Sequence, residues 1–156
     1  MWSPSLLAES HRSLQNLYTY WNAQRGTRSM PGRGDIDPVD LKSLLPDLIL
    51  IDVVTDPRRY VYRLVGTHEV DMRGRDPTGK AVDEAYYGES AEDTTDYLDR
   101  VVRTCAPVLY RGTYQPLRTR TQRDDVLFLP LSKDGDAVNM IMVLSHTDWM
   151  KEEPPL

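Results

Sequence analysis

The sequence of 156 residues has a single cysteine, no excess of basic residues and no long apolar run. The lone Cys105 excludes an internal disulfide and gives no sign of an oxidising compartment. A formal charge of −5 argues against a general nucleic-acid binder, which usually carries a basic excess. No apolar run approaches the roughly 18 residues of a membrane-spanning helix, and the N-terminus lacks the pattern of a secretory signal. These absences predict a cytoplasmic protein without membrane insertion.

What the sequence does contain is typical of one globular domain. Hydrophobic residues make up 40% and charged residues 28% of the chain, close to the globular norm. A chain of this length can bury one substantial core, but it is too short for two unless both were minimal. We therefore expect one main domain over residues 28–147, with a helical segment over 1–27 before it and a charged, proline-ended tail over 148–156.

The N-terminal segment is predicted to be one amphipathic helix. Ser3 and Pro4 form a typical helix start, and Gly26 would stop a helix that runs to about Gln24. The apolar stripe of this helix must be buried, either on the chain's own domain or against the same helix of a second copy in a homodimer. Its candidate interface residues are Leu7, Leu14, Leu17, Tyr18 and Trp21.

Five strands are predicted from short apolar or alternating segments. Tyr60–Val65 alternates with the period of a strand, and Gly66 ends it. The apolar run Leu48–Val54 precedes it and would complete a hairpin. Three later strands are expected to form an antiparallel meander over Val108–Gln115, Val126–Leu131 and Val138–Ser145.

The segment between the hairpin and the meander is predicted to contain one long helix. Thr67–Arg73 has mixed polarity and reads as a polar turn too short for a packed helix, and Gly74 and Gly79 bracket the next turn. Ala81–Gly88 is expected to be irregular. A helix from about Glu89 to Thr104 would pack one apolar face on the sheet.

This order of elements resembles the PAS domain, a five-stranded antiparallel sheet with helices on one face, so an α+β fold is expected. The resemblance covers roughly residues 29–145 and implies a sensory or protein-interaction module of the small single-domain PAS proteins of bacteria. It implies no known ligand, so the cofactor stays unknown. The words that carry the resemblance are DIDP ending at Pro38, LLPDL at Leu44–Leu48, YRLVGT at Tyr62–Thr67, GRDPTGK at Gly74–Lys80 and LPL at Leu129–Leu131.

Two stretches come close to catalytic patterns without completing them. Gly74–Lys80 fits a phosphate loop until Ala81 replaces the magnesium-binding serine or threonine, and Asp76 would oppose a phosphate. His68 begins a zinc-protease pattern, but Met72 stands where its second histidine belongs. We find no acid–base or nucleophile pair, and no metal site is expected.

In a PAS-like fold, a small molecule would lie between the sheet and the helices. Arg63 is a candidate if it points inward, although it could instead bind an acidic residue of the sheet. His68 lines either the pocket or the surface, and the candidate methionines and tyrosines could equally be core packing. The candidate ligand-binding residues are Tyr62, Arg63, His68, Met72, Tyr110, Tyr114, Met140 and Met142.

The sequence thus favours a sensory or signalling module that binds a small molecule, a protein partner or both. Because the sequence contains no output domain, we expect a signal to pass in trans to a partner such as a histidine kinase or regulator. One alternative is a small α+β enzyme with a cone-shaped site, which a buried carboxylate with a raised pKa would favour. The other is a ligand-free adaptor, which a filled core would favour. Neither haem nor flavin is supported by the histidines or by Cys105.

Overall fold

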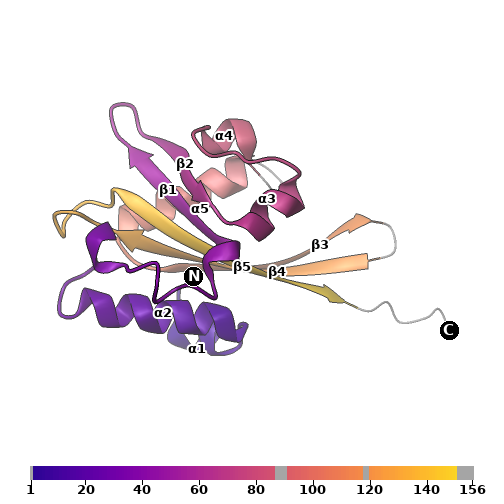
Figure 1. Ribbon diagram of the computed structural model, residues 1–156, viewed down its shortest axis with the longest axis horizontal. Coiled ribbons are helices and arrows are strands. Elements are labelled where there is room, and N and C mark those ends of the chain that lie inside the picture. Colours follow the sequence, from indigo (N-terminus) through magenta and orange to yellow (C-terminus); the bar gives the residue numbers. More distant parts are fainter. Residues whose placement is uncertain (1, 87–90, 118–119, 151–156) are drawn as a thin grey trace.

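The computed structural model describes residues 2–86, 91–117 and 120–150 of the chain. Its centre is a five-stranded antiparallel sheet in the spatial order β2-β1-β5-β4-β3 (Figure 1). Both the predicted hairpin and the predicted meander are present, and β5 joins them by pairing with β1. The strands are β1 (Leu48–Val54), β2 (Arg59–Val65), β3 (Val108–Leu117), β4 (Arg120–Leu131) and β5 (Met140–Met150).

The last two strands are longer than the apolar patterns predicted. β4 begins at Arg120 rather than Val126, and β5 runs on to Met150 rather than ending at Ser145. The extra residues are mostly polar, so apolar alternation does not mark them. They are strands because their backbones continue the ladder, with Thr121 opposite Met150.

Helices cover both faces of the sheet (Figure 1). The first two lie on one face, which we call the α2 face, and the other three lie on the opposite face, the α5 face. Two short 3₁₀ segments, η1 (Arg33–Asp35) and η2 (Leu45–Asp47), lead into β1. The helices are α1 (Pro4–Ala8), α2 (Arg12–Arg25), α3 (Thr67–Arg73), α4 (Val82–Ala85) and α5 (Ala91–Thr104).

The prediction of one continuous N-terminal helix is wrong. The Ser10 amide closes α1 by donating to the Leu7 carbonyl, and a new helix begins when the Nδ1 of His11 accepts from the Ser13 amide. An N-cap of this kind satisfies an exposed amide and fixes the start of a helix. The predicted ends are correct, because Ser3 caps α1 and Gly26 follows α2 at a positive φ of 59°.

The apolar stripe of these helices packs on the chain's own sheet. Leu14 and Leu17 are fully buried, Leu7 is nearly so, and Tyr18 is partly buried. The Nε1 of Trp21 donates to the carbonyl oxygen of Pro130 on β4 at 2.9 Å. Of the two alternatives for the stripe, the structure has the intramolecular one. Dimerisation stays a prediction, and a dimer through this stripe would require α2 to leave the sheet.

The predicted polar turn after β2 is a helix, α3. Gly74 ends it in the left-handed conformation with φ of 78°, and Glu69 and Arg73 form an ion pair one turn apart. Gly66 lets the helix start close to η2, because a Cβ there would lie 2.3 Å from the carbonyl oxygens of Leu45 and Pro46. These local features allow a helix that composition alone does not predict.

The region after α3 matches the prediction more closely. The turn at Gly74 and Gly79 is present, with Asp76 accepting from both the amide and the hydroxyl of Thr78. One part of this prediction is wrong, because Val82–Ala85, in the stretch expected to be irregular, form the short helix α4. The helix α5 ends at Thr104 as expected. The predicted start of α5, at Glu89, lies outside the described residues.

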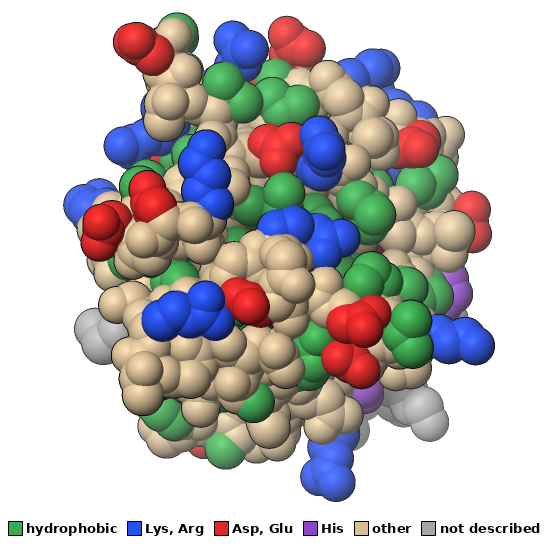
Figure 2. Space-filling model, turned by 60° about the vertical axis from the view of Figure 1, so that its left-hand side comes forward, with side chains coloured by type: hydrophobic (Ala, Val, Ile, Leu, Met, Phe, Trp, Pro, Cys, Tyr) green, Lys and Arg blue, Asp and Glu red, His purple; other side chains and the backbone are tan. Residues whose placement is uncertain are grey.

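The outer surface agrees with the balanced composition of the sequence. The face seen in Figure 2 carries Lys and Arg side chains interspersed with Asp and Glu side chains. Each helix in the described ranges is too short or too polar to cross a membrane.

Candidate functional site

A cavity of about 170 Å³ lies on the α5 face, between the sheet and the helices α3 and α5. An engineered apolar cavity of about 150 Å³ binds a benzene molecule, so this space suits a body of about one ring. Its apolar wall comes from the middle of the sheet and from one side of each helix. The apolar and aromatic lining residues are Ile49, Ile51, Tyr62, Met72, Tyr97, Tyr110, Val126, Phe128 and Val143.

Aromatic rings form the part of this wall nearest α5. The ring centroid of Tyr97 lies 5.0 Å from that of Tyr110 and 5.8 Å from that of Phe128. Tyr110 lies over Gly112, where a Cβ would come within 1.9 Å of the tyrosine oxygen. The missing side chain at Gly112 therefore gives Tyr110 room to lie along its strand.

The remaining lining residues are polar, and we call them the polar wall: Glu69, Arg73, Asp93, Thr94, Gln122, Asp124, Ser145 and Thr147. One of its charged groups is the buried side chain of Glu69. Only 5% of this side chain is exposed. Its Oε1 accepts from the Ser145 hydroxyl at 2.8 Å, and its Oε2 lies 3.8 Å from the Nε of Arg73. A terminal nitrogen of Arg73 in turn donates to the Tyr62 hydroxyl at 3.1 Å and to the Ala85 carbonyl at 3.4 Å. The arginine is thus held between α3, β2 and α4.

A second carboxylate, Asp124 on β4, belongs to the same polar wall. Its Oδ1 accepts from the Gln122 side chain and from the Thr147 hydroxyl, both at 2.8 Å. Gln122 is only 2% exposed, so this hydrogen bond is made away from water. The sheet therefore places a hydrogen-bonded carboxylate beside the cavity.

The surroundings of Glu69 disfavour its charge. Burial is the main cause that raises the pKa of Glu69 above 4.5, the usual value, and the charges of Asp47 and Asp124 add to the rise. The Ser145 hydrogen bond and the charge of Arg73 act in the other direction. A buried carboxylate with a raised pKa in a cavity is typical of functional sites rather than of stabilising ones.

A comparison of the stability of wild type with that of Glu69→Gln is expected to reveal the raised pKa of Glu69. Because folding raises the pKa of Glu69, the folded protein holds this proton more tightly than the unfolded chain does. The stabilisation is complete below pH 4.5 and is lost as the pH rises through the raised pKa. When urea unfolding of both proteins is measured from below pH 4.5 upward, the free energy of unfolding of wild type should fall relative to that of Glu69→Gln as pH rises. A flat or opposite difference would contradict the raised pKa.

Three of the predicted ligand-binding residues line the cavity, whereas Arg63 and His68 lie at the surface. Tyr62, Met72 and Tyr110 are lining residues. Arg63 is 67% exposed and pairs with Asp52 at 3.7 Å, which is the surface alternative given above. The side chain of His68 is 68% exposed and contacts Asp47 rather than the cavity.

The prediction that Met140 and Met142 line the cavity is wrong. Successive residues of a strand point to opposite faces. On β5, Val143 and Ser145 line the cavity, so Met140 and Met142 point to the α2 face, where they are buried. The remaining candidate, Tyr114, lies on β3, but its side chain is outside the described part of the structure.

Several cavity residues were absent from the candidates, chiefly Glu69, Gln122, Asp124 and Ser145. A signal for three of them exists in the sequence. Gln122 and Asp124 share the strand register of Val126 and Phe128, and Ser145 shares that of Val143. Polar residues in an inward register, rather than any motif, would have indicated the site.

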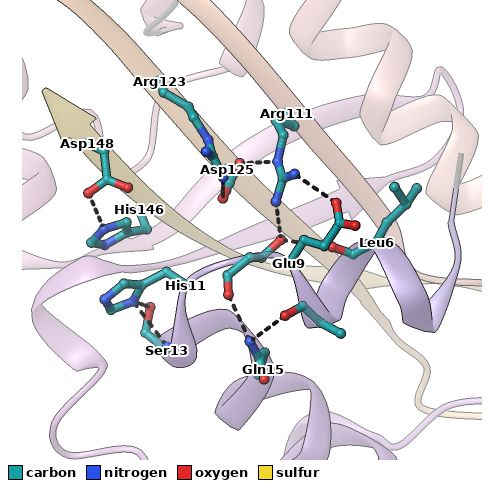
Figure 3. Close-up of polar contacts among 12 residues, drawn as sticks. Leu6, Glu9, His11, Ser13, Gln15, Arg111, Arg123, Asp125, His146 and Asp148 are labelled. Carbon is teal, nitrogen blue, oxygen red and sulfur yellow. Dashed lines mark hydrogen bonds and ion pairs between the residues drawn. The ribbon is translucent and has the colours of Figure 1, made fainter. Parts of the chain in front are cut away.

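A polar network on the α2 face ties the α1–α2 junction to the sheet (Figure 3). Arg111 and Asp125, opposite each other on β3 and β4, form an ion pair at 2.9 Å, and Arg111 also contacts Glu9 at 3.4 Å. The rings of His11 and His146 stack with centroids 3.6 Å apart. We call this network the clasp, and its members are Glu9, Ser10, His11, Arg111, Asp125 and His146.

A second hollow, of about 330 Å³, is lined by residues of α4, α5 and the start of β2. Its charged side chains already contact one another, since Asp99 accepts from the Tyr60 hydroxyl and lies 4.0 Å from Arg58. Burial and Asp99 together raise the pKa of the Tyr60 hydroxyl. This hollow lacks the apolar wall of the α5-face cavity, which is the better candidate site.

Three solved structures are similar to this chain at low sequence identity. A light-oxygen-voltage domain is 9% identical with a TM-score of 0.49, over 69% of this chain and 81% of that one. A sensory box sensor histidine kinase from Vibrio cholerae is 20% identical with a TM-score of 0.48, over 70% and 90%. A fungal light-oxygen-voltage photoreceptor is 13% identical with a TM-score of 0.45, over 86% and 93%. No curated protein sequence matches the chain.

A family model matches most of the chain. The match covers residues 9–145, so it includes β1 to β4, the first part of β5, every clasp residue except His146 and every lining residue of the cavity except Thr147. The matching model describes the PAS domain. The chain therefore belongs to the PAS domain family, whose members are generally sensory rather than enzymatic.

Proposed function

We propose that this PAS domain senses a small molecule bound in the α5-face cavity and passes the signal to a protein partner. The observation that carries the proposal is the buried polar wall around Glu69 in an otherwise apolar cavity. Burying a carboxylate costs stability unless it is well paired, so such a group is expected to serve binding. Apolar walls with a few convergent polar groups are also the usual form of a small-molecule site.

The sheet offers a direct route from the cavity to the opposite face. On β3, β4 and β5, a cavity residue is followed immediately by a clasp residue. A ligand that shifts the cavity side of these strands would also shift the residues that hold the α1–α2 junction. A histidine kinase or another regulator that contacts this junction would then distinguish the two states. The three pairs are Tyr110 and Arg111, Asp124 and Asp125, and Ser145 and His146.

Native mass spectrometry of freshly purified protein tests the ligand directly. We expect extra mass on the folded chain that disappears under denaturing conditions. The variant Val143→Phe, which fills the cavity from β5, should fold but carry no such mass. The matched control is Val39→Phe, the same change at a site that is 78% exposed.

The outcomes separate a sensor from an adaptor. Extra mass on wild type and Val39→Phe, but not on Val143→Phe, supports binding in the cavity. If all three proteins carry the same mass, or if addition of a metabolite extract to each leaves all three bare, the sensory proposal fails and a ligand-free adaptor is favoured. Circular dichroism of each variant confirms that it is folded.

One observation favours an enzyme as a second candidate. Glu69 is the buried carboxylate with a raised pKa that a general base would need. A ligand that is recovered unchanged after long incubation with the protein would support the sensor. Conversion of the ligand by wild type, but not by Glu69→Gln, would support the enzyme.

A further inference from the structure

We infer, on the basis of the proposed sensory function, that the cavity takes a small organic amine. Its ammonium group would lie between the carboxylates of Glu69 and Asp124, and its ring or alkyl body would lie against Tyr97 and Phe128. Nothing in the family match specifies a ligand, so the inference depends on the lining side chains alone.

The first support is the hydrogen bonding of Glu69. A carboxylate can accept about four hydrogen bonds. Among the described residues, Ser145 makes the one hydrogen bond to this side chain, on Oε1. The 3.8 Å from Oε2 to the Nε of Arg73 is an ion-pair contact but too long for a hydrogen bond. A group on a ligand can therefore still donate to Glu69.

The second support is the pairing of Asp124. Its two hydrogen bonds come from neutral groups, the Gln122 amide and the Thr147 hydroxyl, and both reach Oδ1. In the described part of the chain, no lysine, arginine or histidine forms an ion pair with Asp124. Among the described residues, Asp124 thus has acceptor capacity and no cation within ion-pair distance, whereas Arg73, the arginine that lines the cavity, pairs with Glu69.

Charge then decides which ligand fits. Three carboxylates, Glu69, Asp93 and Asp124, line the cavity together with one arginine, Arg73, which already pairs with Glu69, so an anionic ligand would add to the repulsion among negative charges. A cation would offset the repulsion and form charge-assisted hydrogen bonds. A cavity of about 170 Å³ limits the ligand to a compact body.

The test uses three probes of similar size: benzylamine, benzyl alcohol and benzoate. Isothermal titration at neutral pH is expected to give the tightest binding with benzylamine, by about tenfold over benzyl alcohol. Glu69→Gln and Asp124→Asn should each weaken benzylamine about tenfold and leave benzyl alcohol within about twofold. The matched controls are Glu84→Gln and Asp52→Asn, which remove carboxylates that neither line the cavity nor belong to the clasp.

The pH dependence gives a second readout. Protonation of Glu69 removes the charge that the ammonium group pairs with, so benzylamine binding should weaken as pH falls through the pKa of Glu69. This dependence should be smaller in Glu69→Gln. Benzylamine binding that strengthens on acidification would overturn the inference.

The probes also separate this inference from the proposed function. If benzyl alcohol or benzoate binds as tightly as benzylamine, in a manner that Val143→Phe abolishes, the amine inference fails while the cavity remains a ligand site. If none of the three binds, the amine inference also fails, and native mass spectrometry alone decides the sensory proposal.

Discussion

Replacement of Gly66 by alanine is expected to lower the free energy of unfolding by about 3 kcal/mol or more. The φ of Gly66 is −62°, which any residue can adopt, so the glycine is needed for space rather than for its backbone freedom. A Cβ here would lie 2.3 Å from the carbonyl oxygens of Leu45 and Pro46. Neither oxygen belongs to a flexible side chain, so η2 or the start of α3 would have to move.

The matched control is Gly34→Ala, because a Cβ at Gly34 would meet nothing within 4 Å. Urea unfolding should place this control within about 0.5 kcal/mol of wild type. Because Gly66 begins the helix that carries Glu69 and Arg73, the variant should also bind cavity ligands more weakly. A Gly66→Ala protein as stable as the control would mean that η2 does not pack against α3 in solution.

The sheet could be predicted from the sequence because its strands carry their own signals. Leu48–Val54 is a nearly continuous apolar run, and Tyr60–Val65 alternates. The turn residues between strands then impose an antiparallel order. Strand alternation also predicted that Tyr110 points inward, and Tyr110 lines the cavity.

The face on which each residue lies could not be predicted, because helices cover both sides of the central strands. When both faces are buried, a strand such as Met140–Leu144 is apolar throughout, and the period of two loses its contrast. Met140 and Met142 were therefore assigned to the wrong side. The assignment needs the position of α2, which depends on contacts far apart in sequence, such as Trp21 with Pro130.

The carboxylate pair of the cavity was missed for a related reason. Glu69 lies in a segment that composition predicts to be a turn, and it becomes a helix through Gly66 and Gly74. Asp124 lies on a part of β4 that lacks apolar alternation and is defined by pairing with β3 and β5. The register that Asp124 shares with Val126 and Phe128 is a signal only if the strand extends that far, and no local pattern sets the position of Glu69. The two carboxylates therefore could not be placed beside each other before the fold was known.

Replacement of Trp21 by alanine is expected to cost about 3–5 kcal/mol of stability. The side chain is only 2% exposed, and its Nε1 supplies a hydrogen bond to the buried carbonyl of Pro130. Alanine would leave a cavity beneath α2 and an unsatisfied carbonyl on β4. The matched control is Trp2→Ala, because Trp2 is only partly buried and packs on Tyr18 in the middle of α2, so a smaller loss is expected.

The dependence of the unfolding midpoint on protein concentration distinguishes burial of α2 on its own sheet from burial against a second copy. If α2 packs on its own sheet, as in this structure, the unfolding midpoints of wild type and Trp21→Ala should not change with protein concentration. If the stripe is instead buried against a second copy, the wild-type midpoint should rise with concentration, because association stabilises the folded state by mass action. A rising wild-type midpoint, together with a dimer that Trp21→Ala abolishes, would contradict the intramolecular packing. It would also place the clasp at a contact between copies, so that a ligand in the cavity would act on dimerisation.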